Sequence, residues 1–384
     1  MTLRAFVRTL RFRHATRDQY LLRVEVSRAA LRENARIFKQ LIGDLSLAVV
    51  LKSNAYGHGL REVGRIADQI DDVDLLVVDS IVEARTLRGI GARKPILIIG
   101  YVPKSMLQAL TRLKSVTLVV TSLDQARDVA RLVRRSLSVQ IKVDTGMRRQ
   151  GIFPDQLEET IHLLSRNQHL CITGLATHFA DADGADVTMT MNQICVWNEV
   201  VEVYRKRVGE GVFHVSATAG TKFVDRAHAN MVRLGIGFYG FDPIGERPLD
   251  LQPALSFWAK VISVKLLRAG ESVGYNLTYT AQDDRLIALI PCGYSEGVWR
   301  SLSNRGTVFV QGVPCPIIGR VSMNMTVIDI THVPGPVQLE DEVEVYSANR
   351  QQLNSIEAVA NQCDTIPYEV LTRISPSIKR WTVL

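Results

Sequence analysis

This sequence contains few cysteines and no long apolar runs. The chain of 384 residues has five cysteines, widely scattered and none of them in a CxxC pair. Their odd number and spacing argue against a disulfide framework and against a zinc cluster, and suit a reducing compartment. No apolar stretch approaches the roughly 20 residues that a transmembrane helix needs. We therefore expect a cytoplasmic protein with no metal centre and no membrane partner.

Nucleic-acid-binding motifs are missing as well, although the charge balance is basic. The formal net charge is +7, from 46 Lys and Arg against 39 Asp and Glu. These basic residues are spread along the chain, and no zinc-finger, basic-zipper or stacking-aromatic motif accompanies them, so no nucleic-acid partner is expected. Arginine is concentrated only in residues 1–17, which contain no acid. We interpret residues 1–18 as a basic N-terminal extension, with a targeting segment as the alternative.

Short apolar runs alternate with amphipathic stretches from residue 47 to about 240. Their β-branched content and near-continuous hydrophobicity are typical of buried parallel strands. Between them lie helical patterns such as 123–135 and 156–167, with Ser122 and Asp155 placed to begin these helices. Eight such alternations predict an α/β fold with a TIM-type (β/α)₈ barrel rather than an open doubly wound sheet. The runs are 47–52, 74–80, 95–100, 116–122, 139–144, 171–179, 212–220 and 231–240.

The pattern changes after the proline-rich segment 243–253. Strand patterns separated by Gly, Pro or Asp turns follow, with little helix apart from a stretch near 352–362. The sequence therefore predicts a barrel over residues 19–250 and a mostly β C-terminal domain over residues 251–384.

The residues at the ends of the barrel strands are candidates for chemistry, because barrel enzymes place their sites at the C-terminal ends of the strands. These ends carry Lys52, Lys142, His178 and Arg233. An isolated lysine at a strand end usually reaches solvent. A lysine crowded by other cations has a depressed pKa instead, and can become a nucleophile that forms a Schiff base. The strand-end position of Lys52 leaves both interpretations open.

Several motifs now give the chain a specific resemblance. "AVVLKSNAYGHG" (48–59) resembles the pyridoxal-phosphate lysine signature of alanine racemases, a family of fold type III. Further similarity covers nearly everything from residue 20 to the end, and it implies a (β/α)₈ barrel plus a β domain working as a homodimer. The other motifs, in order, are "KVDTGMRRQGI" (142–152), "GLATHFADAD" (174–183), "NMVRLGIGFYG" (230–240), "GESVGYNLTY" (270–279), "PCGYSEGVWR" (291–300), "GRVSMNMTVID" (319–329) and "PYEVLTRISPSIKR" (367–380).

The resemblance implies the catalytic and cofactor-binding residues. Lys52 binds pyridoxal 5'-phosphate and serves as one base, and Tyr275 of the partner subunit serves as the second. Arg233 faces the pyridine nitrogen, where related decarboxylases place a glutamate. An arginine is donor-only and keeps its proton, so the ring nitrogen must stay unprotonated. The remaining cofactor-binding residues are His178, along the ring, and Tyr56, Thr218, Gly235, Ile236 and Tyr368, around the phosphate.

Substrate binding is implied in the same way. Arg149, helped by the backbone of Met323, holds the substrate carboxylate or the cofactor phenolic oxygen. Lys142 matches a lysine that many members carbamylate. The entry corridor comprises Asp183, Tyr294, Arg300, Arg320 and Ile366, together with Tyr368. The sequence departs from the family pattern in three places. Ala217 and Thr218 stand in the first two places of a usual Asn-Ser-Ala, Asn324 replaces a common aspartate, and Asp181 replaces a small residue.

These implications predict an alanine racemase, an isomerase that interconverts L- and D-alanine by a two-base mechanism and supplies D-alanine for peptidoglycan. A serine or broader-specificity racemase of the same family is the alternative, because Asn324 and Asp181 could shift the substrate preference. A non-catalytic cofactor carrier with a similar barrel is a further alternative. Such carriers lack a domain like residues 254–384 and lack the second-base tyrosine, Tyr275, which argues against this alternative.

Overall fold

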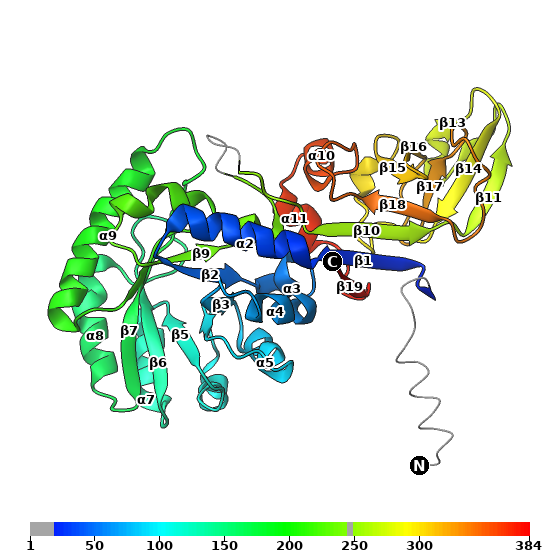
Figure 1. The fold of residues 1–384 in the computed structure, drawn as a ribbon. Helices are drawn as coiled ribbons and strands as arrows, with labels where there is room; N and C mark the ends of the chain where they lie inside the picture. The colour runs from blue at the N-terminus through cyan, green and yellow to red at the C-terminus, as the bar shows by residue number, and fades with distance from the viewer. Residues whose placement is uncertain (1–18, 244–248) are drawn as a thin grey trace, which may run out of the picture. The chain divides into compact units, whose positions relative to one another are not determined.

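The computed structural model describes residues 19–243 and 249–384 (Figure 1). The predicted N-terminal extension, residues 1–18, lies outside the described residues. The chain divides into two compact units, and each is described by itself below. One unit is Arg28–Pro253, and the other joins Met1–Ser27 to Ala254–Leu384. The domain boundaries expected from the sequence stay a prediction.

The unit Arg28–Pro253, hereafter the barrel unit, contains eight strands in the order β8-β7-β6-β5-β4-β3-β2-β9, each parallel to its neighbours. The end strands approach each other through the bonds Asn230 N–H to Phe213 O (2.9 Å) and Arg233 N–H to Ser216 O (3.2 Å). This confirms the predicted (β/α)₈ barrel. Its strands are β2 Ser46–Val50, β3 Leu75–Val78, β4 Ile96–Ile98, β5 Val116–Val120, β6 Leu137–Lys142, β7 Leu170–Ala176, β8 Val212–His214 and β9 Met231–Leu234.

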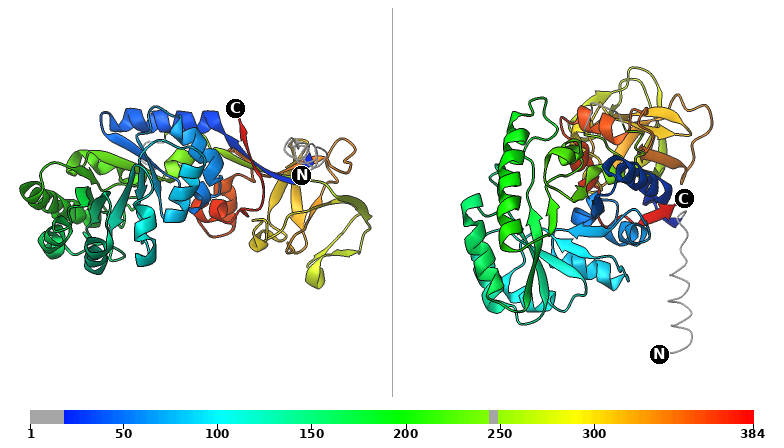
Figure 2. Two further views of the ribbon diagram at one scale, coloured as in Figure 1. Left: turned by 90° about the horizontal axis from the view of Figure 1, so that it is seen from below. Right: turned by 60° about the vertical axis from the view of Figure 1, so that its left-hand side comes forward.

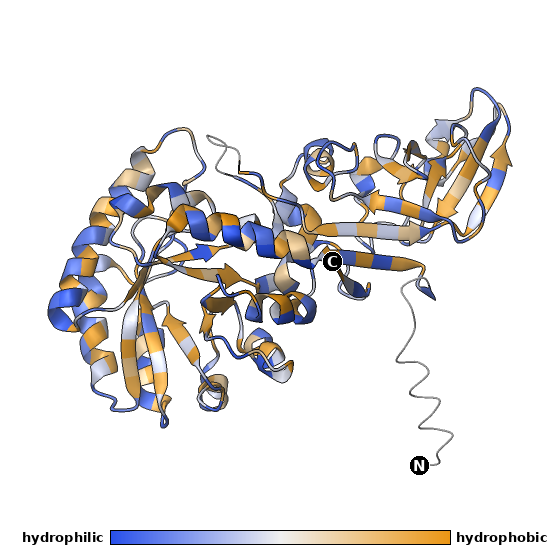
Figure 3. Cartoon of the chain, viewed as in Figure 1, coloured by the Kyte–Doolittle hydropathy of each residue, from blue (hydrophilic) through white to orange (hydrophobic). Residues whose placement is uncertain are grey.

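Helices surround these strands on the outside, as the further views of Figure 2 also show. Apolar residues fill the strands, and the outer helix faces are polar (Figure 3), which is the pattern of a parallel barrel buried on both faces. The α-helices are α2 Arg28–Ile42, α3 Lys52–Tyr56, α4 Leu60–Asp68, α5 Ile81–Gly89, α6 Leu107–Leu110, α7 Leu123–Leu132, α8 Leu157–Ser165 and α9 Thr188–Arg207. The 3₁₀ helices are η2 Lys104–Met106, η3 Pro154–Gln156, η4 Ala219–Arg226 and η5 Ile236–Tyr239.

The two predicted helix starts have different outcomes. Ser122 is the N-cap of α7, and its side chain accepts a hydrogen bond from the Gln125 amide, as a serine cap does. Asp155 does not cap α8, because the proline at position 154 begins the 3₁₀ turn η3 and Asp155 lies within that turn. The side chain of Gln156 instead accepts the Phe153 amide at 2.9 Å.

The second unit, hereafter the β unit, is built on a nine-stranded sheet in the order β11-β14-β17-β16-β15-β18-β10-β1-β19. β1 pairs antiparallel with β10 and parallel with β19, so the first and last strands of the chain are neighbours. Its elements are β1 Leu22–Ser27, β10 Leu255–Lys260, β11 Ser263–Leu267, β12 Ser272–Val273, η6 Tyr275–Leu277, β13 Tyr279–Thr280, β14 Arg285–Ile290, η7 Arg300–Leu302, β15 Thr307–Val310, β16 Val313–Ile318, β17 Thr326–Asp329, β18 Glu342–Tyr346, α10 Ile356–Gln362, α11 Pro367–Thr372 and β19 Arg380–Val383. The predicted mainly β C-terminal part is confirmed.

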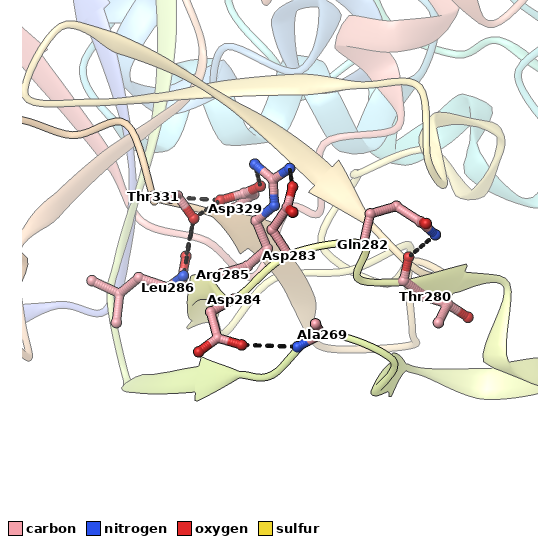
Figure 4. A network of polar contacts seen from close by, with 9 residues as sticks. All are labelled: Ala269, Thr280, Gln282, Asp283, Asp284, Arg285, Leu286, Asp329 and Thr331. Atoms are coloured by element: carbon pink, nitrogen blue, oxygen red, sulfur yellow. Dashed lines mark hydrogen bonds and ion pairs between the residues drawn. The ribbon is translucent and has the colours of Figure 1, made fainter.

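A polar network holds the start of β14 in this unit (Figure 4). Arg285 lies between two carboxylates, 3.4 Å from Asp283 and 3.7 Å from Asp329. The Thr331 hydroxyl donates to Asp329 at 2.6 Å and accepts the Leu286 amide at 2.9 Å. These contacts tie the β14 end to the loop after β17 and have no direct role in the site described next.

Candidate active site at the mouth of the barrel

Strand ends of the barrel unit carry the residues that the sequence singled out. Lys52 follows β2, Lys142 is the last residue of β6 and His178 follows β7. Arg233 lies in β9, and Thr218 lies between β8 and η4. Because all eight strands are parallel, these residues belong to the same end of the barrel, where barrel enzymes carry their chemistry.

The backbone after Lys52 makes an unusual left-handed turn. The φ angles of Ser53, Asn54, Ala55 and Tyr56 are 55°, 55°, 52° and 51°. Each non-glycine residue in this conformation costs roughly 1–2 kcal/mol. Two side chains stabilise the turn: Glu83 accepts the Ser53 amide at 2.8 Å, and Asn54 accepts the Leu60 amide at 2.9 Å. Such strain is typical of sites where the backbone direction matters more than stability.

This turn brings Tyr56 to a glycine-rich anion-binding cup formed by Tyr56, Thr218, Gly235 and Ile236. The Tyr56 ring stacks on Tyr239 with 4.9 Å between centroids. A Cβ added to Gly235 would lie 3.0 Å from the Tyr56 hydroxyl, so a side chain here would crowd the cup. The Thr218 hydroxyl oxygen accepts the amides of Gly235 and Gly237, both at 3.2 Å, which fixes the backbone on either side of Ile236. Hydroxyls and backbone amides gathered in this way suit a phosphate.

Arg233 is buried and donates to neutral acceptors. Its Nη1 donates to His214 O at 3.0 Å, and its Nη2 donates to Thr177 O at 2.8 Å and Val215 O at 3.2 Å. Burial lowers the pKa of Arg233 to about 10, so it stays charged at neutral pH. Its guanidinium therefore remains a fixed cation that backbone carbonyls hold from one side.

The same arginine fixes the protonation of two histidines. Its Nη1 contacts Nδ1 of His214, whose Nε2 lies 2.7 Å from Gln140 Oε1. Since arginine can only donate, His214 is neutral with its proton on Nε2. The Nη2 of Arg233 lies 3.2 Å from Nδ1 of His178. Burial, followed by the charge of Arg233, lowers the pKa of His178 to about 3 and that of His214 well below its usual value.

Positive charge accumulates at this mouth without matching carboxylates. Burial lowers the pKa of Lys142 to about 8, and nearby cations add to the shift. Asp144 opposes it, but its Oδ1 accepts the amides of Gly146 (2.9 Å) and Arg148 (3.0 Å), which orders the loop that carries Arg149. In the described part of the chain no carboxylate lies within ion-pair distance of the four rim cations, which are Lys52, Lys142, Arg149 and Arg233.

These observations fit a dianionic cofactor and an anionic substrate. Four uncompensated cations beside an anion-binding cup favour ligands that carry negative charge. Lys52 supplies the amine to which an aldehyde can attach, and the cup supplies donors for a phosphate. The residues present therefore suit pyridoxal phosphate together with a carboxylate-bearing substrate.

The remaining predicted residues lie in two further places. Asp183 is exposed in the loop between β7 and α9 of the barrel unit. The others belong to the β unit, where several large side chains are exposed: Tyr275 70%, Ile366 58%, Met323 57% and Tyr294 46%. Arg300, Arg320 and Tyr368 also lie in the β unit, Arg300 at the start of η7 and Tyr368 in α11.

Sequence reasoning missed Gln140 and His214. Both are fully or nearly fully buried polar residues in barrel strands, with exposed fractions of 3% and 0%. Buried polar groups require partners. The available signal was therefore the presence of a glutamine and a histidine inside the otherwise apolar runs 139–144 and 212–220.

Comparison with known proteins gives consistent matches over both units. The model of the alanine racemase N-terminal domain matches residues 26–243, and that of the alanine racemase C-terminal domain matches residues 254–382. The alanine racemase of Syntrophobacter fumaroxidans is 36% identical over 91% of this chain and 94% of its own length. That of Sorangium cellulosum is 34% identical over 94% of this chain and 98% of its own length.

Solved structures agree. The alanine racemase of Bacillus anthracis with bound L-Ala-P superimposes with a TM-score of 0.87 at 30% identity, covering 95% of each chain. The Clostridium difficile 630 enzyme in complex with cycloserine gives a TM-score of 0.86 at 28% identity, covering 95% of this chain and 96% of that one. In the described residues, no helix combines the length and apolar character required to cross a membrane.

The fold and the site together define a barrel isomerase of the class that uses pyridoxal phosphate. More narrowly, the chain belongs to the alanine racemase family. The family and the enzyme class predicted from the motifs are thus confirmed. The roles of individual residues stay predictions.

Proposed function

We propose that the protein interconverts L-alanine and D-alanine with pyridoxal phosphate as cofactor, acts in the cytoplasm and supplies D-alanine for peptidoglycan. The observation that best supports this proposal is the set of four rim cations beside the anion-binding cup. Among the described residues, no carboxylate lies within ion-pair distance of these cations. Lys52 would hold the cofactor covalently. Tyr56, Thr218, Gly235 and Ile236 would hold its phosphate, joined by Tyr368 on the family pattern.

The cofactor, when bound, supplies an electron sink that weakens the substrate Cα–H bond. The chain's own residues then provide the proton transfers. Racemisation needs a base on each face of Cα, and Lys52 takes one face. Tyr275 of a second copy takes the other, in agreement with its 70% exposure in the single chain. Arg149 and the Met323 amide hold the substrate carboxylate, so that Cα stays between the two bases.

Arg233 limits the reaction to proton exchange. A guanidinium cannot accept a proton, so a ring nitrogen that it contacts stays unprotonated. Arg233 facing the bound cofactor would thereby disfavour side reactions such as transamination. His178 and His214 are neutral and add no competing acid.

Lys142 is proposed to carry a carbamate that orients Arg149. Its pKa of about 8 supports this, since a substantial neutral fraction at pH near 8 is available to react with carbon dioxide. A carbamate would also place a negative charge among the rim cations. Electron density for an unmodified ammonium at Lys142 in crystals of the active enzyme would contradict the assignment.

The decisive experiment is chiral chromatography after incubating the cofactor-loaded protein separately with L-alanine, L-serine and L-lysine. A Lys52→Ala variant serves as the control. Conversion of alanine that is lost in the control supports the proposal. Faster conversion of serine or lysine would instead favour the broader-specificity alternative, and would direct attention to Asn324 and Asp181. Cofactor binding without racemisation of any of them would refute the proposed activity.

A further inference from the structure

Two loops of the β unit are joined to each other by backbone hydrogen bonds. Residues 293–298 follow β14, and residues 321–325 precede β17. The Tyr294 amide donates to Ser322 O at 3.0 Å, and the Ser295 amide donates to Met323 O at 2.9 Å. A Cβ at Gly293 would lie 2.1 Å from Ser322 O, so only glycine permits this approach. The paired loops form one rigid edge that presents Tyr294 and Met323.

A side-chain contact closes the same pair of loops. Asn324 Nδ2 donates to Glu296 Oε1 at 2.7 Å, and Glu296 Oε2 accepts the Gly293 amide at 2.9 Å. The backbone oxygen of Glu296 accepts the Ser375 amide at 3.2 Å, which anchors the loop to the turn after α11. Hydrogen bonds to a carboxylate are roughly twice as strong as neutral ones. Both oxygens of Glu296 are therefore engaged, one on each loop.

We propose that Asn324 and Glu296 form a positioning pair, hereafter the clasp, which holds the Met323 peptide ready for the substrate carboxylate. The inference rests on the proposed function, because that is where Met323 contacts substrate. The Met323 amide lies in the peptide between Ser322 and Met323, and Asn324 is the next residue along the chain. Fixing the side chain of Asn324 therefore limits the backbone rotation about Met323 that would reorient this amide. The clasp acts through Met323 and does not itself touch the substrate.

The clasp depends on having one negative charge rather than two. An aspartate at position 324 would place a second carboxylate where the amide nitrogen now lies, 2.7 Å from the Glu296 oxygen. Two carboxylates that share a site cannot both ionise freely, and the pKa of one is raised. Asn324 and Glu296 are therefore interdependent: the asparagine at the position where the motif usually has aspartate is matched to the glutamate.

The other titratable groups on the packed elements are placed differently. Cys292 is buried, and its pKa is raised by burial first and by Glu296 second. Arg373, next to the turn that binds Glu296, pairs with Glu369 at 2.5 Å and lies over the Trp299 ring. Tyr294 belongs to the first loop, and Arg320 precedes the second. A charge added at position 324 therefore interacts most strongly with Glu296.

The test is the steady-state kinetics of alanine racemisation by Asn324→Asp between pH 6 and 9. A carboxyl pKa raised by one unit from its reference value of about 4 still lies near 5, so both carboxylates of the variant are ionised throughout this range. Their repulsion opens the clasp, so the KM of the variant exceeds that of the unmodified protein by about tenfold at every pH tested, which corresponds to one unit of pKa coupling. The relative kcat changes by less than about twofold, since neither base is moved. A KM ratio near one across this range overturns the proposal.

The double variant Asn324→Asp/Glu296→Gln provides the rescue, because a glutamine at position 296 can donate to an aspartate at position 324 and the pair again has one charge. Its KM should return to within about twofold of the unmodified protein at pH 9. Asn361→Asp is the matched control, because it makes the same change at an exposed asparagine of the same unit. Failure of the rescue with a folded double variant also overturns the clasp.

Thermal unfolding separates this test from that of the proposed function. The melting temperature of Asn324→Asp should fall below that of the control at every pH from 6 to 9, whether or not alanine is the substrate. A fall without any change in KM means that the pair is structural only, which overturns its positioning role. Inactivity of the unmodified protein toward alanine would refute the proposed function, and the melting curves would still report on the contact.

Discussion

The ammonium of Lys142 is destabilised by its surroundings at the barrel mouth. Burial lowers its pKa from the usual value of 10.5 to about 8, and the charges of Arg233, Arg149 and Lys52 act in the same direction. The native state therefore binds this proton less tightly than the unfolded state does. Stability is reduced below pH 8, and it increases as the pH rises from about 8 to 10.5.

Replacing Lys142 with methionine should remove this pH dependence. In carbon-dioxide-free buffer, the free energy of unfolding of the cofactor-free protein should rise relative to Lys142→Met by up to about 3 kcal/mol between pH 7.5 and 10.5. Urea unfolding followed by circular dichroism at several pH values measures the difference. Parallel curves for the two proteins would mean that Lys142 is better solvated than the structure indicates.

At the scale of elements, the left-handed turn Ser53–Tyr56 stores backbone strain that glycine relieves. Ser53 has φ 55° and ψ 52°, and its side chain is exposed. Glycine adopts this conformation without penalty, so Ser53→Gly should stabilise the protein by about 0.5–1 kcal/mol, net of the added freedom of the unfolded chain. Chemical denaturation gives the value.

A serine in a right-handed helix is the matched control for that change. Ser165 is exposed at the end of α8. Ser165→Gly should destabilise the protein by about 0.5 kcal/mol, since glycine weakens a helix. Stability changes of opposite sign for Ser53→Gly and Ser165→Gly would show that the gain at Ser53 comes from its positive φ. Equal signs would count against strain in the turn.

At the scale of the whole molecule, the proposed pairing of Lys52 with the partner's tyrosine makes the protein an obligate dimer. Lys52→Ala and Tyr275→Phe proteins should each have little activity. Mixed after subunit exchange, they should regain about a quarter of normal activity, because half of the dimers are mixed and each of these has one intact site. The racemisation rate and the sedimentation of the mixture measure this.

Mixing Lys52→Ala with the double variant Lys52→Ala/Tyr275→Phe is the control and should restore nothing. Recovery in the control would show that Lys52 is not required, and no recovery in the test mixture would place both bases in one subunit. Full activity in a sedimenting monomer would have the same meaning.

The fold was largely predictable, because barrel strands and helices are encoded locally. β-branched runs located all eight barrel strands, and Ser122 marked the start of α7. The pairing of β1 with β10 and β19 was not predictable, since it joins residues more than 200 positions apart. The left-handed turn also lacked a signal. Of its four residues, only Asn54 belongs to a type that readily adopts positive φ.

The candidate site was predictable for a different reason. Lys52, Lys142, His178 and Arg233 stand at strand ends, so the barrel topology alone brings them to one mouth. The contacts among them depend on side-chain packing. The link from Gln140 through His214 to Arg233 runs across three strands, and no spacing in the sequence encodes it.

The pairing of β1 also affects how the chain is made. During translation the barrel unit leaves the ribosome as one continuous segment, Arg28–Pro253, and can fold at once. β1 emerges before it but pairs with β10, which begins at Leu255. At about 5–20 residues per second, roughly 10 to 50 seconds pass before that partner strand is synthesised. Throughout this interval β1 lacks both of its neighbouring strands, and its unpaired backbone N–H and C=O groups make it a potential site of aggregation.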